Sequence, residues 1–569
     1  MGIRRLAIID VAGGDQPISN EDQTIWVVCN GEIYNHVSLR SDLTARGHAF
    51  KTKSDVEVVV HLFEEYGDDF IDHLQGMFAL FLATPDGCYV ARDRLGIKPL
   101  YQMQTTEGVY FASEIRALLE LPGAPRPATD PSRVADYFLF RYVPEPRTAF
   151  VGIDRFPAGQ ITRLSADGVT SRTYWQLRRP GPFIGSFDDA VAECEERLQR
   201  LVHMHLMSER PVGVFLSGGL DSSLVSAMAA RQSQHPIVLL TASFPGSDVD
   251  ESAYAREVAG HLGAAHHVIG LDSLGLDDWT RAVDVVEDLV ADPATVPLIA
   301  LSRKARENLT VALLGEGSDE TNLGYEGFSN LRTLAGRRRV SRHFPFAPRS
   351  GPWSYRLGLP GMDDPAFLAR FTNAAIPVQD FPPFLGPLPS AAERIRGEVI
   401  RITSRDHLSL MEKNRLFRIE GWMKDDLLIK VDKATMASSI EARVPFLDHT
   451  FVEWSFSIPD AYALRGGKTK AVLRAVASRL LPDRIATRSQ HGLVLPLAAL
   501  FTALGPALLG FLKRPDALWR IAFEEKPVLG ILDRFARGDA SLAFFVYQMV
   551  NAEMWRERWL LSAPVADSR

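Results

Sequence analysis

Cysteine is scarce in this sequence: only Cys29, Cys88 and Cys194 occur among 569 residues. They form no CxxC pair and show no Cys/His spacing typical of a metal site. So few thiols exclude a disulfide framework and fit a reducing compartment, so we expect a cytoplasmic protein. The first residues include Arg4 and Arg5 but no long apolar segment, and we therefore expect no secretory signal.

Positive charge is not in excess either. Lysine and arginine total 63 against 70 aspartates and glutamates, a formal net charge of −7. No overall positive field attracts nucleic acid or an anionic membrane, so neither is expected as a partner. Residues 493–512 are uncharged and long enough to cross a bilayer, but Pro496, Gly505, Pro506 and Gly510 interrupt them. We expect short buried helices there.

The chain is too long for one compact domain. Apolar residues make up 46% and charged residues 23% of it, which excludes a disordered chain. Residues 179–186 are rich in proline and glycine and mark the best boundary. We predict domains at residues 1–178 and 187–569, with Ser186 and Asp189 forming a capping box where the next helix begins.

The first domain is predicted to be rich in strands. Strand runs at residues 24–34 and 108–114 and a hairpin at 77–93 stand beside helical patterns at 37–46 and 56–66. Asn30 and Gly31 are expected to form a turn at the end of the first run.

The second domain shows strand–helix alternation. Apolar strand runs occur at residues 211–216, 237–244 and 310–314, and residues 222–232 have helical spacing. Such alternation predicts a parallel α/β sheet. From about residue 391 onward helical patterns dominate.

The sharpest motif follows a buried strand run and opens a helix: Ser217-Gly218-Gly219-Leu220-Asp221-Ser222-Ser223. Its two glycines let the backbone approach a ligand, and its hydroxyls and free helix N-terminal amides can cradle an anion. Asp221 places a carboxylate where a Mg²⁺ ion bridging phosphates can bind. A helix-capping turn is the alternative, but the strand–loop–helix context favours phosphate binding. The loop lacks the Gly-Lys-Ser/Thr element of a Walker A motif.

A second acidic loop follows the strand run at 310–314: Gly315-Glu316-Gly317-Ser318-Asp319-Glu320. Ligands bind at the carboxyl ends of parallel strands, where this loop is expected. Asp319 can hold Mg²⁺ opposite Asp221, and Glu316 can accept a proton from an attacking amine. Standing alone, the loop is as well explained as a solvated acidic turn.

The first loop resembles the pyrophosphate loop of the N-type ATP pyrophosphatases. Further blocks extend the likeness over nearly the whole chain, at residues 4–10, 16–22, 30–35, 54–58, 91–101, 111–118, 261–267, 429–449 and 466–474. In this order they resemble class II glutamine-dependent amidotransferases of the asparagine synthetase B family. The alternative for parts of these blocks is structural: Asp432 and Glu441 can be buried ion pairs, and His266-His267 a packed or solvated pair.

The resemblance implies an N-terminal Ntn-hydrolase-type αββα domain, here partial, that hydrolyses glutamine to ammonia. It implies a C-terminal parallel-sheet ATP pyrophosphatase domain with a helical C-terminal part. That domain would use ATP and Mg²⁺ to adenylate aspartate, and ammonia arriving through an internal tunnel would displace AMP to give asparagine. By analogy with the family, a homodimer is expected.

The resemblance implies a role for each residue at a matching position. The ATP site would comprise Leu216, Ser217, Gly218, Gly219, Asp221, Ser222, Ser223, Ala242, Leu314 and Gly315. Glu316 and Lys470 match catalytic positions, Lys470 stabilising charge on the reacting phosphate. Asp221 and Asp319 would bind the metal. Glutamine would be bound by Arg5, Asn30, Gly31, Glu32 and Asp55.

The sequence departs from the family at its start, where the family has a nucleophilic cysteine with a free α-amine. Residue 2 is Gly2, and the first strand of the family domain is missing. Cys29, within a strand run, and Cys88, on a hairpin, cannot replace that cysteine. We expect either a truncated gene model, which the retained glutamine-binding residues favour, or a protein that has lost glutaminase activity.

Smaller departures concern the acceptor. Leu314 replaces a serine, and residues 321–325 and 490–493 differ from the family pattern. The acceptor is therefore aspartate or another carboxylic acid. An intramolecular amide-forming cyclase of the β-lactam synthetase or lasso-peptide type is the enzymatic alternative, and a degenerate regulatory paralogue the non-enzymatic one.

Overall fold

The computed structural model describes residues 1–561 apart from 179, 248–249, 272–273, 342, 344–361, 372–374, 378–379, 405–406, 489–496, 498–500 and 502–507. Most of the helices predicted at residues 493–512 therefore lie outside the described residues. No helix in the described part of the chain combines the length and the apolar character needed to cross a membrane.

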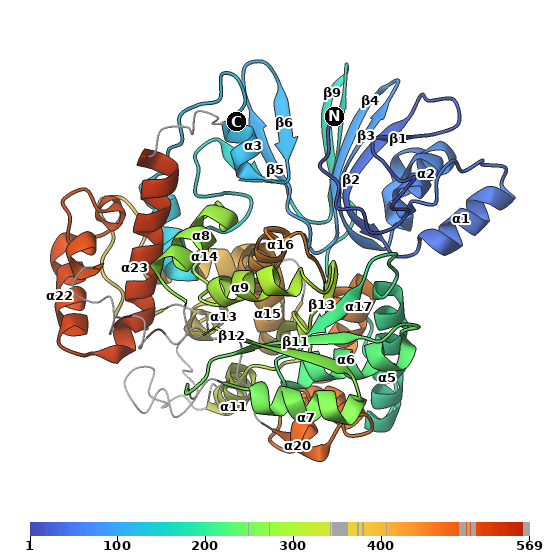
Figure 1. Ribbon diagram of the computed structural model, residues 1–569. Helices are drawn as coiled ribbons and strands as arrows, with labels where there is room; N and C mark the ends of the chain where they lie inside the picture. Colours follow the sequence, from blue (N-terminus) through green and yellow to red (C-terminus); the bar gives the residue numbers. More distant parts are fainter. Residues whose placement is uncertain are drawn as a thin grey trace.

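Two antiparallel sheets form the N-terminal part. The larger has the order β1-β2-β3-β4-β8-β9, with bounds Ile18–Ser19, Trp26–Ile33, Gly76–Thr84, Gly87–Arg92, Gln160–Ser165 and Gly168–Thr173. The smaller has the order β6-β5-β7, with bounds Val109–Ala112, Tyr101–Gln104 and Ile153–Arg155. Helices α1 (His36–Ala45) and α2 (Val58–Tyr66) lie on one side of the larger sheet and the smaller sheet on the other (Figure 1).

Both faces of the larger sheet are therefore buried. Val27, Leu80 and Leu82 pack with Val58 and Leu62 in a core under α2. A smaller cluster that includes Ala79 and Val90 packs on the other face. The alternation of side chains along β2 and β3 explains why these runs are almost wholly apolar, and the predicted strands and the 77–93 hairpin are confirmed.

The turn predicted at Asn30 and Gly31 is wrong, because both residues lie inside β2. Gly31 pairs with Phe78 of β3 and has φ +142°. A Cβ atom there would lie 1.9 Å from the Met77 carbonyl oxygen. The glycine thus permits a close approach of two strands. The predicted turn was inferred from the Asn-Gly pair, which is common in turns.

The C-terminal part contains a five-stranded sheet with the order β12-β11-β10-β13-β14, in which every pairing is parallel. The strands span Ala265–Gly270, Val238–Ser243, Val212–Phe215, Val311–Leu313 and Glu441–Arg443. The predicted strands at 211–216, 237–244 and 310–314 and their parallel arrangement are confirmed. β12 and the short β14 were not predicted, because one carries two histidines and the other lies among helices.

Helices cover both faces of this sheet. On one side lie α5 (Phe187–His205), α6 (Leu220–Gln232) and α7 (Ser252–Leu262), which pack with Val214, Leu239 and Leu313. On the other lie α8 (Leu276–Val286), α9 (Thr295–Ala305) and α16 (Leu428–Met436), which pack with Leu240 and Ala312. Such double coverage is typical of parallel sheets. The capping box at Ser186 and Asp189 is confirmed at the start of α5.

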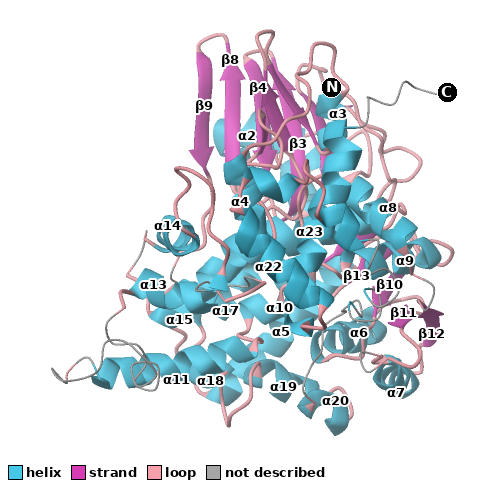
Figure 2. Cartoon of the chain, turned by 90° about the vertical axis from the view of Figure 1, so that its left-hand side faces the viewer, coloured by secondary structure: helices cyan, strands magenta, loops and turns pink. Residues whose placement is uncertain are grey.

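Further helices follow in the C-terminal part. Before residue 391 they are α10 (Ser318–Thr321), α11 (Glu326–Ser341) and α13 (Asp364–Leu368). The helical part predicted from about residue 391 contains α14 (Ala391–Thr403), α15 (Leu410–Phe417), α17 (His449–Ser457), α18 (Asp460–Ala463), α19 (Ala471–Ala477), α20 (Asp483–Thr487), α22 (Glu525–Ala536) and α23 (Ala543–Arg556). The last, α23, stands beside α8 at the edge of the molecule (Figures 1 and 2). It also reaches the first domain, because the hydroxyl of Tyr137 on α4 (Pro131–Phe140) donates to the Gln548 carbonyl at 2.9 Å.

Buried ion pairs join the two parts of the chain. Arg155 on β7 is 1% exposed and lies 2.6 Å from Asp288 and 3.3 Å from Asp425. Lys98 lies 3.0 Å from Asp432, and Arg443 lies 2.8 Å from Glu441. The structural interpretation of Asp432 and Glu441 as members of buried ion pairs is therefore confirmed.

Replacing Arg155 by Met should lower the free energy of unfolding by about 3–5 kcal/mol, because two carboxylates lose their buried cation. Arg172→Met is the matched control: Arg172 is 38% exposed and its pairs with Asp69 and Asp72 face solvent, so about 1 kcal/mol or less is expected. Urea denaturation of both variants measures the difference. Equal midpoints would show that the Arg155 pairs do not hold the two parts together.

Candidate active site

The predicted phosphate loop and the acidic loop lie side by side at the carboxyl end of the sheet. β10 leads into the first loop and β13, its hydrogen-bonded neighbour, into the second. The chain continues from β10 to β11 on one side and returns to β13 on the other, so the two loops flank a topological switch point. A Cβ atom on Gly315 would lie only 2.7 Å from the amide nitrogen of Ser222. Glycine is thus required for the two loops to touch.

Hydroxyl groups shape the phosphate loop itself. The Ser217 and Ser222 hydroxyl oxygens are 3.0 Å apart, and the Gly219 amide donates to Ser217 Oγ at 3.2 Å. Gly218 has φ +78°, and a Cβ there would lie 2.7 Å from the Ala255 amide nitrogen of α7. Ser223 Oγ is buried without a hydrogen-bond partner among the described residues. The loop therefore has both the compactness and the spare donor that a bound phosphate needs.

Lys470 lies between two carboxylates at the mouth of this loop. Its Nζ atom is 2.6 Å from Asp221 Oδ2 and 2.7 Å from Asp319 Oδ1, and its side chain is 1% exposed. Burial lowers the pKa of Lys470, but the two carboxylates outweigh burial and raise it. Ser318, which the sequence analysis did not single out, donates from its hydroxyl to Asp221 Oδ1 at 2.7 Å.

Gly324 leaves the space that Asp319 and Lys470 occupy. A Cβ atom at this position would lie 1.9 Å from Asp319 Oδ1 and 2.2 Å from Lys470 Cε. In the sequence, residues 321–325 stand out only as a departure from the family pattern. No pattern in the sequence indicates that this glycine faces the lysine, which lies far along the chain.

Glu316 lies apart from this cluster, beside a different cation. Lys430 Nζ is 3.5 Å from Glu316 and 2.9 Å from Asp292. The Glu316 side chain is 30% exposed, so it can reach a ligand. Sequence reasoning missed Lys430 and Asp292, because the pair joins α16 to the segment before α9.

A cavity of about 910 Å³ opens over these groups. Nine of the predicted residues line it: Leu216, Ser217, Asp221, Ser222, Ala242, Leu314, Gly315, Glu316 and Asp319. Gly218, Gly219, Ser223 and Lys470 are not among its lining residues, and the side chains of Ser223 and Lys470 are buried. Arg488, which was not predicted, also lines the cavity and donates to the Gly218 carbonyl at 2.9 Å.

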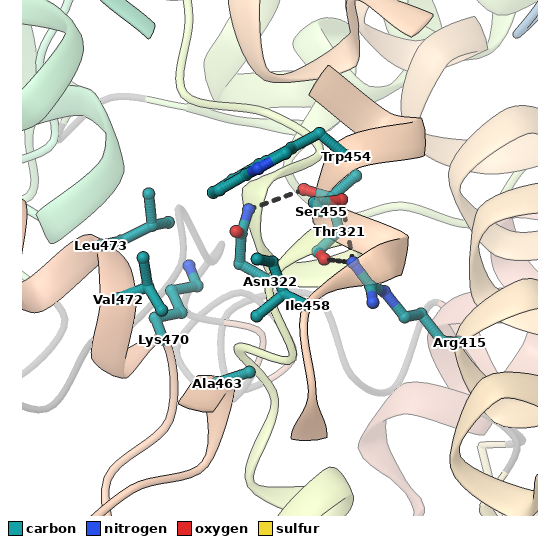
Figure 3. A pocket seen from close by; sticks show the side chains of 10 residues that line it. All are labelled: Thr321, Asn322, Arg415, Trp454, Ser455, Ile458, Ala463, Lys470, Val472 and Leu473. Carbon is teal, nitrogen blue, oxygen red and sulfur yellow. Dashed lines mark hydrogen bonds between the residues drawn. The ribbon is translucent and has the colours of Figure 1, made fainter. Parts of the chain in front are cut away.

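A second hollow lies behind Lys470, with only about 10 Å³ of space (Figure 3). Val472, Leu473, Ile458 and Trp454 line it, and on its far side Arg415 donates to the Ser455 hydroxyl at 2.8 Å. This volume holds at most about one water molecule. The hollow is therefore a packing space that fixes the lysine stem.

Four of the five predicted glutamine-binding residues lie together in the first domain. Asn30, Gly31 and Glu32 are consecutive on β2, and Asp55 Oδ2 accepts a hydrogen bond from the Ile33 amide at 2.8 Å. Glu32 Oε1 lies 3.3 Å from Arg443 Nη2 on β14 of the second domain. Thus an arginine that the sequence did not single out links the two candidate sites.

Arg5 reaches this group only indirectly. Its guanidinium donates to the Asp10 carbonyl at 3.0 Å, and Asp10 Oδ2 accepts from the Lys53 amide at 2.8 Å, two residues before Asp55. The Nη1 atom of Arg5 is buried and has no hydrogen-bond partner among the described residues. The carboxylate of Asp15, 3.7 Å from this atom, is the nearest acid, and a substrate carboxylate would have to compete with it.

Burial controls the protonation of the acids in this pocket. It raises the pKa of Asp55 to about 6. It raises the pKa of Glu32 well above its usual range, helped by the charges of Asp55 and Glu441. Near neutral pH, Asp55 is thus the acid of the two that carries charge.

None of the three cysteines is prepared for nucleophilic attack. Burial raises the pKa of Cys29 and Cys194, and to a smaller extent that of Cys88. Cys29 lies inside β2, 3% exposed, and pairs with Leu80 across the sheet. A thiol held in its protonated form is a poor nucleophile.

Two family models match the chain. Residues 193–553 match the asparagine synthase family, and residues 1–175 match the glutamine amidotransferase domain family. The chain belongs to the asparagine synthase family. The family resemblance inferred from the sequence motifs is thereby confirmed, together with the α/β fold class.

Relatives match along most of their length. Asparagine synthetase [glutamine-hydrolyzing] 1 of Bacillus subtilis is 32% identical over 87% of this chain and 80% of its own length. Asparagine synthetase [glutamine-hydrolyzing] 3 of the same organism is 30% identical over 86% of this chain and 79% of its own. A putative asparagine synthetase [glutamine-hydrolyzing] of Mycobacterium bovis is 29% identical over 97% and 89%.

Replacing Gly324 by Ala should reduce pyrophosphate release at least about 100-fold, because the added methyl group displaces Asp319 and Lys470 from each other. Gly336→Ala is the matched control, since a Cβ there meets nothing within 4 Å and the position is in α11. Initial rates of pyrophosphate release with Mg-ATP measure the effect. Comparable rates for the two variants would exclude the Asp319–Lys470 contact from the reaction.

The predicted role of Asp55, pairing with the substrate ammonium group, implies that glutamine binding weakens as the pH falls below about 6, because protonation removes the charge of this carboxylate. The dissociation constant is expected to rise about tenfold per pH unit below that value. Titration calorimetry between about pH 5 and pH 8 measures it. The Asp55→Asn variant should bind weakly at every pH, and a pH-independent wild-type affinity would contradict this role.

Proposed function

We propose that this protein is an ATP-dependent asparagine synthase. It converts aspartate, ATP and ammonia or glutamine to asparagine, AMP and pyrophosphate, with β-aspartyl-AMP as the intermediate. The single observation that carries this proposal is Lys470 held at 2.6 and 2.7 Å between Asp221 and Asp319, at the mouth of a serine–glycine loop. Membership of the asparagine synthase family supports it.

The residues present fit ATP and Mg²⁺. Asp221 and Asp319 offer hard oxygen ligands within reach of one cation, as Mg²⁺ requires. The loop from Ser217 to Ser223 offers backbone amides, the unpartnered Ser223 hydroxyl and a surface that glycines keep free of Cβ atoms. When bound, Mg²⁺ would neutralise charge on the phosphates and orient them.

The side chains around this loop then have separate tasks. Lys470 is a fixed point charge that stabilises negative charge on the reacting phosphate, and its burial strengthens the interaction. Leu216, Ala242, Leu314 and Gly315 line the part of the cavity that would hold the nucleoside. Glu316 accepts the proton that the attacking ammonia releases, while Lys430 holds its carboxylate in place.

Aspartate is favoured as the acceptor acid over the larger acids of a cyclase. The relatives described above are named asparagine synthetases and match this chain along both of its parts. An intact phosphate loop with its lysine and two carboxylates also speaks against a degenerate regulatory paralogue. Glutamine would bind in the first domain to Arg5, Asn30, Gly31, Glu32 and Asp55.

Ammonium should serve directly as the nitrogen donor for this chain. Because the pKa of each of its three thiols is raised, no thiolate is available to attack the glutamine amide. We expect the chain as printed to form asparagine from ammonium and to release no glutamate from glutamine.

The decisive experiment measures pyrophosphate and asparagine formed from Mg-ATP, aspartate and ammonium. Asp221→Asn should reduce both about 100-fold or more, because it removes one carboxylate of the cation site. Asp86→Asn, in the exposed turn between β3 and β4, is the control and should leave the rate unchanged. Thermal denaturation shows that each variant is folded.

Two other outcomes would overturn the proposal, and a third would remove one assigned role. ATP–pyrophosphate exchange that appears only with a larger carboxylic acid would indicate a cyclase. Binding of ATP without any turnover would indicate a regulatory paralogue. Unchanged pyrophosphate release by Asp221→Asn would remove the metal-binding role of this residue.

A further inference from the structure

A cluster of two histidines and two glutamates lies in the first domain, away from the phosphate loop. Glu21 comes from the loop between β1 and β2, His48 from the segment after α1, and His61 and Glu64 from α2. One ligand atom of each side chain lies within 4.8 Å of the corresponding atoms of the other three. Three separate segments of the chain therefore converge on one point.

The distances within this cluster suit a tetrahedral metal ion. His48 Nδ1 is 3.6 Å from Glu21 and 3.4 Å from Glu64. His61 Nδ1 is 3.4 Å from Glu21 and 3.0 Å from Glu64. Metal–ligand bonds of 2.0–2.2 Å place neighbouring ligands of a tetrahedral zinc ion about 3.4 Å apart. The two histidines face different oxygens of Glu21, so its carboxylate would have to turn to offer one oxygen to the ion, and one ligand atom of each of the four residues already lies within 4.8 Å of the others.

The second nitrogen of each imidazole faces a further carboxylate. His48 Nε2 is 3.0 Å from Glu65, and His61 Nε2 is 3.9 Å from Glu57. Metal-binding histidines usually have a carboxylate or carbonyl at their second nitrogen, which orients the ring and makes it a better ligand. Both histidines thus present Nδ1 to the centre, but only His48 Nε2 is hydrogen-bonded to an outer acid, because His61 Nε2 is too far from Glu57 for a hydrogen bond.

The two glutamates are held in place as well. Asn20 Nδ2 donates to Glu64 Oε1 at 2.9 Å, and the Ala49 amide donates to Glu21 Oε1 at 2.7 Å. His61 is fully buried and His48 is 13% exposed, while Glu21 and Glu64 reach solvent at 35% and 26%. The site is therefore organised on its protein side and accessible to an ion on the other.

We propose that Glu21, His48, His61 and Glu64 bind one divalent transition-metal ion of the zinc type. Two imidazoles and two carboxylates select such an ion over Mg²⁺, which prefers oxygen ligands alone. Four protein ligands would close the coordination sphere, so the site is structural. A bound ion would connect the segment around His48 to α2. Glu57, next to His61 Nε2, lies just before α2 and two residues after Asp55.

The same four side chains have a simpler interpretation, in which protonated imidazoles form ion pairs with the glutamates. The acids around His61 raise its pKa although burial lowers it. A bound metal requires neutral imidazoles and therefore displaces these protons. The experiment must distinguish stoichiometric metal binding from such ion pairing.

The full chain is stripped with a chelator and titrated with Zn²⁺ by calorimetry, in an excess of Mg²⁺ that occupies carboxylate-only sites. One equivalent of Zn²⁺ should bind and raise the melting temperature, whereas further Mg²⁺ should not. His48→Gln and His61→Gln should each abolish that equivalent. Glu65→Gln, at the outer acid, should weaken binding about 10–100-fold.

His267→Gln is the matched control, because this exposed histidine lies on β12 outside the cluster and its loss should change nothing. If His61→Gln fails to fold, the more exposed His48 and Glu65 variants still decide the question. The proposal is overturned if the wild type binds no stoichiometric Zn²⁺, or if the His48 variant binds it as the wild type does. Because the readout is metal binding, asparagine formation is tested separately.

Discussion

The structure of the candidate active site depends on one buried cation between two anions. Lys470 begins α19 with a left-handed backbone, φ +53°, which turns its side chain back toward Asp221 and Asp319. Asp221 is buried and Asp319 is 29% exposed, so the two carboxylates would repel each other without a cation between them, and burial and Asp221 do raise the pKa of Asp319. The ammonium group keeps the pair together, and the same charge is then available for a phosphate.

Close backbone approach is the second constraint. Gly315 brings the acidic loop against Ser222, and Gly324 leaves room for the lysine. Each glycine acts on a residue from another strand or helix, so a methyl group at either position would move catalytic groups apart. The phosphate loop is thus one wall of a site whose other walls come from β13 and the segment before α19.

Buried charges also connect the two halves of the molecule. Arg443 on β14 contacts Glu32 of β2 and Glu441 beside it, and Lys98 pairs with Asp432 on α16. β14 pairs with β13, which leads into the acidic loop, so one arginine and one strand pair lie between Glu32 and that loop. Such pairs cost desolvation free energy, so they specify how the domains fit together more than they add to stability.

Local sequence was enough to predict strands β2, β3, β4, β6, β10, β11 and β13, the parallel sheet, the helix start at Ser186 and the two loops that lie at the mouth of the sheet, but not the other strands. These features follow from apolar periodicity, from capping chemistry and from glycine and serine spacing, which act over a few residues. The predicted Asn30-Gly31 turn was wrong because its outcome depends on a distant segment. Whether this glycine forms a turn or allows a close strand contact is decided by β3, which pairs with it.

Tertiary structure alone decided the rest. That Lys470 lies between Asp221 and Asp319, that Gly324 makes room for it, and that Arg443 reaches Glu32 are relations between residues far apart in the chain. The same holds for the convergence of Glu21, His48, His61 and Glu64. Local preferences carry no information on such distances, because only the packing of helices and sheets brings the side chains together.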